Sequence, residues 1–469
     1  MTSPSAPRYA DLDAAALSAA YADGSLTPSA VLEDVIARVE AREPVLNAFY
    51  LFDAEQVRAD AAASTARWAA GTPLSPFDGV PVTVKENVAR AGLPKPSGTA
   101  IPNPPIAEHN APITDRLLEA GTVIIGSTTM PDWGMLSSGV SSLHGVTRGG
   151  LNPAHTSGGS SAGAGAAASA GYGPFHIGTD IGGSIRLPGT WQGLTALKPS
   201  EGLIPLDGPY MGRAAGPLTR TAADSIRLMS IVARPDARDY LTRAYPAMDW
   251  STTPLAPAGM RVAVQLDAGS GIDVEPETRA AIERAAQLFA EAGAEVTPLA
   301  PFIGPEVLDG IVDFWRSRSY ADYELLSEEE RALVLPFIAE WCAAGADFSA
   351  AQTVRGRGMM DQMARLTREA TEPFDLVLSP VTPVAAFPAE DPMPLTDPRV
   401  TMGHISFTVP YNMSGQPAVS VGAGIQADGR TIGLQIASHI GTDDMLLRVA
   451  AWFETVRGAD ATVDWSLLP

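Results

Sequence analysis

The chain has 469 residues and a formal net charge of −21 at pH 7, from 53 acidic and 32 basic side chains. Its 45 % hydrophobic content is typical of a globular protein with a large buried core, which excludes disorder as the dominant state. Because nucleic acids and anionic membranes need a basic surface on a partner, the acidic balance argues against both as partners.

The cysteine content and the apolar runs indicate a compartment. A single cysteine, Cys342, permits neither an intramolecular disulfide nor a cysteine-based metal cluster, and a buried, inert thiol is its expected state. The first residues lack a basic region followed by an apolar run, and no later stretch approaches about 18 uninterrupted apolar residues. We therefore expect a cytoplasmic protein.

The first segment with regular periodicity covers residues 9–70. Val31, Val35 and Val39 recur at helical spacing after a capping residue, Thr27 or Ser29. This pattern predicts an N-terminal helical layer over residues 1–70.

From residue 78 onward, short apolar runs are broken by Gly and Pro. The order is strand, helix, strand in the segments VPVTV, TDRLLEAG and TVIIGSTT. Such alternation is typical of α/β architecture. We expect a core over residues 75–235.

The remainder of the chain divides into two parts. Residues 245–370 begin with another strand-helix-strand unit, from MRVAVQLDAG to AEVTPLAPF, and are otherwise mainly helical. Residues 373–469 return to alternating strands and helices. Because no repeat and no long linker separates these parts, we expect one domain over residues 1–469.

The glycine- and serine-rich stretch offers two weak motifs. Residues 159–163 fit a G-x-S-x-G nucleophile elbow centred on Ser161, and residues 163–168 fit a dinucleotide-binding string. Neither follows the apolar strand that its motif requires. A small-residue helix is the better interpretation of the second.

A third pattern lies at residues 178–189, with the sequence GTDIGGSIRLPG. Gly182 and Gly183 allow successive N–H groups to converge beside Ser184. The backbone amides of Ile181, Gly182, Gly183 and Ser184 could then stabilise a developing oxyanion. A simple tight turn is the alternative.

Four segments together decide between these interpretations: GVPVTVKEN, SGGSSAG, GTDIGGSIR and LTALKPS, beginning at residues 79, 157, 178 and 194. They resemble the amidase signature family. The resemblance implies a Ser-Ser-Lys triad with Ser184 as nucleophile, Ser160 as proton relay after a cis peptide, and Lys85 as base. It also implies the family's fold, an α/β/α domain whose central mixed sheet is covered by helices on both faces.

The residue chemistry agrees with these roles. Lys85 follows an apolar strand, and burial favours the neutral amine that can accept a proton. Proton transfer through Ser160 then allows acid-base catalysis without histidine. Further residues complete the expected site: Ser161, Thr179, Asp180 and Arg186 in support, the last two as an ion pair, with Trp133 and Tyr210 in the substrate pocket.

Cofactors and metals are not expected. The six histidines are scattered and none has metal-ligand spacing. The expected partner is a small-molecule amide, and a homodimer is the commonest soluble assembly.

The predicted activity is hydrolysis of a linear amide through an acyl-enzyme, with aryl amides, esters and carbamates as further substrates. Three alternatives remain: an amidotransferase A-type subunit that releases ammonia from glutamine with a partner, a non-catalytic binding module on the same fold, and an NAD-dependent enzyme.

Overall fold

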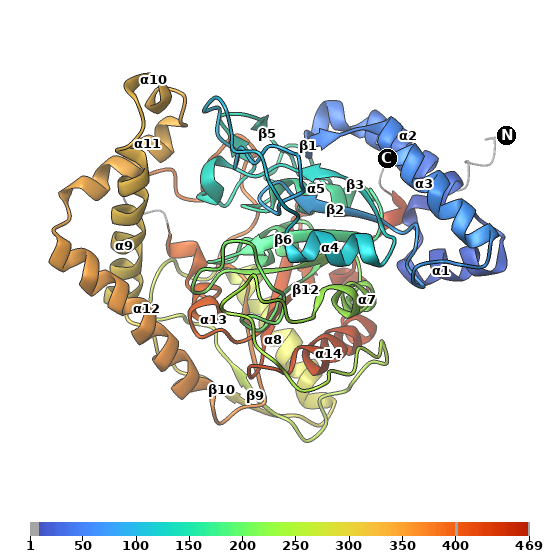
Figure 1. Ribbon diagram of the computed structural model, residues 1–469. Helices are drawn as coiled ribbons and strands as arrows, with labels where there is room; N and C mark the ends of the chain where they lie inside the picture. The colour runs from blue at the N-terminus through green and yellow to red at the C-terminus, as the bar shows by residue number, and fades with distance from the viewer. Residues whose placement is uncertain (1–8, 399–401, 468–469) are drawn as a thin grey trace.

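An 11-stranded sheet runs through the protein in the computed structural model, which describes residues 9–398 and 402–467 (Figure 1). The strand order is β1-β3-β2-β6-β8-β7-β12-β13-β11-β9-β10, and a separate ribbon pairs β4 with β5. The strands are β1 (Phe49–Phe52), β2 (Pro81–Lys85), β3 (Val123–Thr128), β4 (Val140–Ser141), β5 (Gly145–Val146), β6 (Phe175–Asp180), β7 (Thr195–Lys198), β8 (Ala214–Thr219), β9 (Arg261–Val264), β10 (Glu295–Pro298), β11 (Leu376–Pro380), β12 (Ala418–Ile425) and β13 (Thr431–Ala437).

The sheet is mixed. β3, β2 and β6 run parallel, as do β11, β9 and β10, whereas the strands from β6 through β8, β7, β12 and β13 to β11 pair antiparallel. Parallel neighbours need a crossover, and the helix between β2 and β3 supplies one. The strand-helix-strand prediction for this part of the chain is confirmed.

Helices cover both faces of the sheet. α7 packs against α4 and α14, all three contact the sheet, and α5 packs against α6 beside the central strands. No helix in the described residues combines the length and apolar character that a bilayer span requires. The helices are α1 (Ala14–Asp23), α2 (Pro28–Leu46), α3 (Ala54–Ala69), α4 (Pro112–Glu119), α5 (Ala162–Ala170), α6 (Arg186–Trp191), α7 (Ala222–Val232), α8 (Pro276–Glu291), α9 (Pro305–Tyr323), α10 (Glu328–Arg331), α11 (Pro336–Ala343), α12 (Ala350–Thr371), α13 (Val409–Met413) and α14 (Asp443–Val456).

The small-residue helix predicted after the paired serines is α5. All nine of its residues are buried, because alanine and glycine allow neighbouring elements to approach its backbone closely. This finding removes the dinucleotide-binding interpretation of the same residues.

The predicted N-terminal helical layer differs from the structure at one point. α2 ends at Leu46, and the following Asn47 has a φ of 51°, a left-handed conformation that terminates helices. The next residues, Phe49–Phe52, form strand β1, which pairs antiparallel with β3 at the edge of the sheet. An aromatic run favours a strand, and this strand was missed because the helical periodicity was extended through it.

The region from 245 to 370 has two parts. β9, α8 and β10 extend the sheet, as predicted. α9 and α12 lie side by side at one edge of the molecule, on the left in Figure 1. Their buried residues, among them Ile311 and Met360, pack on Leu187 and Ile405 in an apolar cluster separate from the main core.

Candidate active site

Lys85 is the last residue of β2. The strand is buried along its whole length between β3 and β6, and the Lys85 side chain is fully buried with it. The Lys85 Nζ lies 2.8 Å from Ser160 Oγ and 3.2 Å from Ser161 Oγ. The predicted base and relay are therefore in direct contact.

The environment of Lys85 favours the neutral amine. The pKa of Lys85 is lowered to about 7, mainly by burial and also by the positive charge of Arg213. The negative charges of Glu86 and Asp180 raise this pKa, but by less. A desolvated ammonium loses its hydration, and a nearby cation raises its energy further. Lys85 can thus hold or release a proton near neutral pH.

The paired serines have different surroundings. The peptide bond between Gly159 and Ser160 is cis. Ser161 Oγ accepts a hydrogen bond from the Thr179 N–H and donates to the Thr179 carbonyl, each at 3.1 Å. Ser161 and Thr179 thereby attach the serine loop to the end of β6.

Ser184 lies in the glycine turn that follows β6. Its carbonyl accepts a hydrogen bond from the Ser161 N–H at 3.1 Å, which joins the turn to the serine loop. Gly183 has a φ of 124°, open to glycine but strained for other residues. The Gly183 N–H donates to Asp180 Oδ1 at 2.8 Å, whereas the sequence had grouped this N–H with three others as an oxyanion donor.

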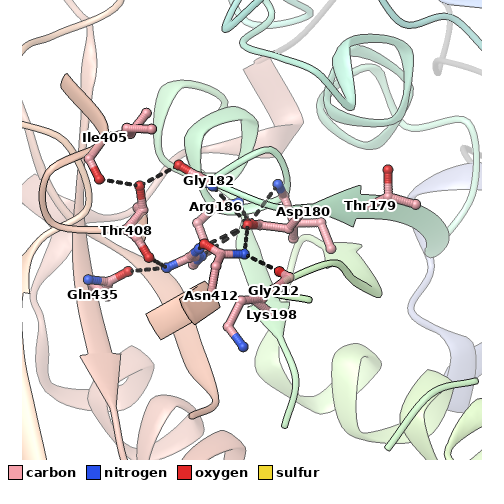
Figure 2. Close-up of polar contacts among 12 residues, drawn as sticks. Thr179, Asp180, Gly182, Arg186, Lys198, Gly212, Ile405, Thr408, Asn412 and Gln435 are labelled. Atoms are coloured by element: carbon pink, nitrogen blue, oxygen red, sulfur yellow. Dashed lines mark hydrogen bonds and ion pairs between the residues drawn. The ribbon is translucent and has the colours of Figure 1, made fainter. Parts of the chain in front are cut away.

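Asp180 and Arg186 form a fully buried ion pair, with 2.9 Å between Asp180 Oδ1 and Arg186 Nη2 (Figure 2). Burial alone would raise the pKa of Asp180. The Arg186 charge and hydrogen bonds from Arg186, Asn412 and Ile185 outweigh it and hold this pKa well below its usual range. The ion pair expected from the sequence is confirmed, and it anchors the turn that carries Ser184.

Residues from the C-terminal part of the chain complete this network. Arg186 donates to the Thr408 carbonyl at 3.0 Å, Gln435 Oε1 at 2.8 Å and Asn412 Oδ1 at 2.6 Å. The Thr408 hydroxyl donates to the Gly182 carbonyl at 2.6 Å. Sequence reasoning assigned no role to these three residues, because their contacts with Arg186 join parts of the chain that are far apart in sequence. In Figure 2, Lys198 lies beside the network, and its Nζ donates to the Pro199 carbonyl.

Ser184 opens onto a cavity with two lobes. The larger lobe has a volume of about 440 Å3, and its wall includes Ser160, Tyr210 and Trp133. The smaller lobe, of about 130 Å3, shares Ser184 and Trp133 with it. The two predicted pocket residues therefore both line the cavity that contains the serines.

Trp133 is held in an unfavourable backbone conformation. Its φ is 49°, which is rare for a bulky residue, and its N–H donates to the Ser97 carbonyl at 2.7 Å. Ser97 also has a positive φ, of 53°. Strained residues of this kind cluster at functional sites, because surrounding packing must hold them in place.

Comparison with known proteins agrees with this geometry. A family model described as Amidase matches residues 30–447. The chain belongs to the amidase signature family. This amidase is 35 % identical to an acylamidase of Rhodococcus erythropolis over 95 % of both chains. It is thus a hydrolase of carbon–nitrogen bonds other than peptide bonds.

Other relatives of the amidase differ in their described activity. The A-type subunit of a glutamyl-tRNA(Gln) amidotransferase from Symbiobacterium thermophilum is 30 % identical over 95 % of this chain and 96 % of its own. Among solved structures, a bacterial aryl acylamidase has the same fold, with a TM-score of 0.87 at 24 % identity over 96 % and 97 % of the two chains. A 6-aminohexanoate cyclic dimer hydrolase matches with a TM-score of 0.82 at 25 % identity over 98 % of each chain.

In this amidase, Asp180→Asn is expected to lower the free energy of unfolding by about 3–5 kcal/mol, because it leaves the Arg186 charge buried without its counterion. Urea denaturation followed by circular dichroism measures the change. As a control, Glu369→Gln removes the carboxylate of an exposed pair with Arg365, and we expect a loss below about 1 kcal/mol. Equal losses in the two variants would contradict a structural role for the buried pair.

Proposed function

We propose that the protein hydrolyses linear amides through a Ser184–Ser160–Lys85 triad and an acyl-enzyme intermediate. The observation that carries this proposal is the 2.8 Å contact between the fully buried Lys85 Nζ and Ser160 Oγ, in a cavity whose wall also holds Ser184. A base, a relay and a nucleophile in one water-accessible cavity are the parts that acyl transfer requires.

The acylation step follows from the protonation state of Lys85. Neutral Lys85 takes the Ser160 hydroxyl proton as Ser160 takes the proton of Ser184, and Ser184 Oγ attacks the amide carbonyl. The same chain of groups then returns the proton to the leaving nitrogen, and the carbon–nitrogen bond breaks. The released amine departs, and the acyl group stays on Ser184 as an ester.

The oxyanion that forms during attack needs hydrogen-bond donors. Since the Gly183 N–H already serves Asp180, we assign this role to the backbone amides of Ile181, Gly182 and Ser184. Asp180, Arg186 and Thr408 keep that turn in shape. A water molecule activated by Ser160 and Lys85 finally hydrolyses the ester and regenerates the enzyme.

The substrates that this arrangement suits are small or medium linear amides. Two relatives named for acylamidase activity support amides of this kind, and the apolar part of the cavity suits aryl groups. Esters and carbamates present the same carbonyl to Ser184 and are expected as additional substrates.

A chromogenic panel tests the activity directly. The purified protein is given an anilide, a primary amide, a carbamate and an ester, and each rate is compared with that of a Ser184→Ala variant. Hydrolysis by the wild type that is absent from the variant supports the proposal and ranks the substrates. A wild-type protein that is inactive on every compound of the panel contradicts it.

An amidotransferase subunit is the second candidate, because the relative from Symbiobacterium thermophilum is similar over almost the whole chain. The charge of −21 disfavours it, since such a subunit works in a complex that holds tRNA. Glutaminase activity that appears only with a partner subunit would support the second candidate over the first.

The pH dependence of kcat/KM is expected to report Lys85. The base acts only when neutral, so activity should rise with pH through an apparent pKa of about 7 and then level off. An ordinary lysine would place this limb near pH 10. Arg213→Gln removes one cause of the lowered pKa and should move the limb to higher pH. Initial rates on one neutral anilide across pH give the profile, and a flat profile would contradict the role of Lys85.

A further inference from the structure

Two arginines line the larger lobe of the cavity, Arg213 and Arg318. Arg213 follows the glycine-containing loop before β8, and its Nη1 donates to the Gly208 carbonyl at 2.8 Å. Arg318 projects from α9 and is exposed. The chain as a whole has a net charge of −21, so two positively charged side chains on one cavity wall differ from its generally acidic character.

The carboxylates near these arginines are engaged elsewhere. Asp180 is paired with Arg186, and Asp207 lies 3.8 Å from Lys95. Asp207 and, more weakly, Asp239 attract Arg213 electrostatically, and Asp239 also accepts the backbone N–H groups of Leu206 and Leu241.

Asp322 also lines the lobe. Even so, neither Arg213 nor Arg318 forms an ion pair with a carboxylate in residues 9–398 and 402–467. The wall retains unpaired positive charge.

Tyr210 adds a hydrogen-bond donor beside these cations. The Arg318 guanidinium lies over the Tyr210 ring, 4.5 Å from its centre, which fixes the position of both side chains. The Tyr210 hydroxyl is buried, and the Arg318 guanidinium lies close enough to act on it as a hydrogen-bond donor. A ligand carboxylate on this wall would accept hydrogen bonds from both side chains.

The smaller lobe has the opposite character. Its wall includes Leu187, Ile405, Trp315 and Trp341, and of the two arginines only Arg318 lines it as well as the larger lobe. At about 130 Å3 it approaches the size of an apolar cavity known to bind benzene, about 150 Å3. A short alkyl or aryl group fits among these apolar side chains, whereas Arg213 and Tyr210 line the larger lobe alone.

The position of Ser160 determines which part of a substrate lies in which lobe. Ser160 lines the larger lobe, and it is the group that protonates the leaving nitrogen. We infer that the enzyme prefers N-acylated amino acids and related anionic amides, with the carboxylate of the amine portion bound by Arg213, Arg318 and Tyr210 and the apolar acyl group in the smaller lobe. This inference rests on the proposed function, because it uses the relay role of Ser160.

The reaction consumes one water molecule. The carbon–nitrogen bond breaks, the acyl carbon gains the water hydroxyl to become a short carboxylic acid, and the nitrogen gains the remaining proton to become the free amino acid. Bidentate pairing with arginine suits the planar carboxylate of the amine portion, which does not take part in the reaction.

Three butanoyl anilides of similar size test the preference, with para substituents ending in CH2COO−, CH2CH2OH and CH2CH2NH3+. For the wild type we expect kcat/KM to be highest for the anion and lowest for the cation, by about tenfold or more between anion and neutral compound. In Arg318→Gln, the kcat/KM for the anionic compound divided by that for the neutral compound should fall towards one. We expect this fall to come chiefly from a higher KM for the anionic compound. Arg213→Gln should have the same effect, and thermal melting verifies that each variant is folded.

A second series places the carboxylate on the acyl side, as succinyl against pentanoyl anilide, and no preference for the anion is expected there. Inhibition of neutral anilide hydrolysis by phenylacetate, and its loss in Arg318→Gln, measures carboxylate binding without requiring turnover of a charged substrate. Equal kcat/KM for the anionic and neutral butanoyl anilides, a preference that persists in both arginine variants, or a preference confined to the succinyl series would overturn the inference. Failure to hydrolyse any of the anilides, charged or neutral, together with inactivity on the chromogenic panel, would instead refute the proposed function.

Discussion

Ser184→Ala is expected to abolish amide turnover, with a loss in kcat of roughly 10^4-fold or more, because no other hydroxyl takes the place of the nucleophile. Ser184 lines both lobes of the cavity and is positioned by the Ser161 N–H through its own carbonyl, so the substitution leaves the backbone contact intact. Release of aniline from a neutral anilide, measured by chromatography, gives kcat and KM for both proteins.

Two controls make this result specific. Ser230→Ala removes an exposed hydroxyl on α7 that bonds only the preceding turn of its own helix, and its kcat should match the wild type. A fluorophosphonate probe should label the wild type and leave Ser184→Ala unlabelled. A variant that keeps a substantial part of the activity would contradict the role of Ser184 as nucleophile. An unlabelled, inactive wild type that still binds amides would favour the non-catalytic binding module.

Lys85→Ala is expected to lower kcat/KM by roughly 10^3-fold or more, because it removes the base and leaves Ser160 without a proton acceptor. Lys85→Arg should be equally inactive, since a guanidinium stays protonated and cannot accept the proton. Initial rates at pH 8, where wild-type Lys85 is largely neutral, measure both losses.

Another lysine of the chain supplies the comparison. Lys95 is partly exposed and lies 3.8 Å from Asp207, so Lys95→Ala should have little effect on kcat. Circular dichroism verifies that the Lys85 variants are folded. If Lys85→Ala retained a tenth or more of wild-type kcat/KM in a folded protein, a different base would have to serve Ser160, and the proposed triad would be wrong.

Local signals predicted two features of the candidate site, and the resemblance to the family supplied the roles of its residues. The apolar strand before Lys85 indicated a buried lysine, and the structure has that lysine fully buried at the end of β2. The paired glycines indicated a turn that presents Ser184, and Gly183 has the positive φ that such a turn requires. These features depend on neighbours in sequence, which is why the sequence alone could reveal them.

The remaining features depend on contacts between distant residues. The Asp180 carboxylate accepts the Gly183 N–H and so removes one backbone donor from a possible oxyanion hole. The direction in which this carboxylate points cannot be predicted from the sequence. Asn412 and Gln435 reach Arg186 across more than two hundred residues of sequence. β1 was missed for a different reason, since its signal competes with the stronger periodicity of the helix before it.

The position of Arg186 has a consequence for biosynthesis. Its guanidinium donates hydrogen bonds to Asp180 and to three residues that are translated much later, Thr408, Asn412 and Gln435. A nascent chain that ends before these residues has a nucleophile but lacks most of the acceptors that hold its turn in shape. We therefore expect the hydrolase to gain activity only near the end of its translation, and chains that end before Thr408 to be inactive.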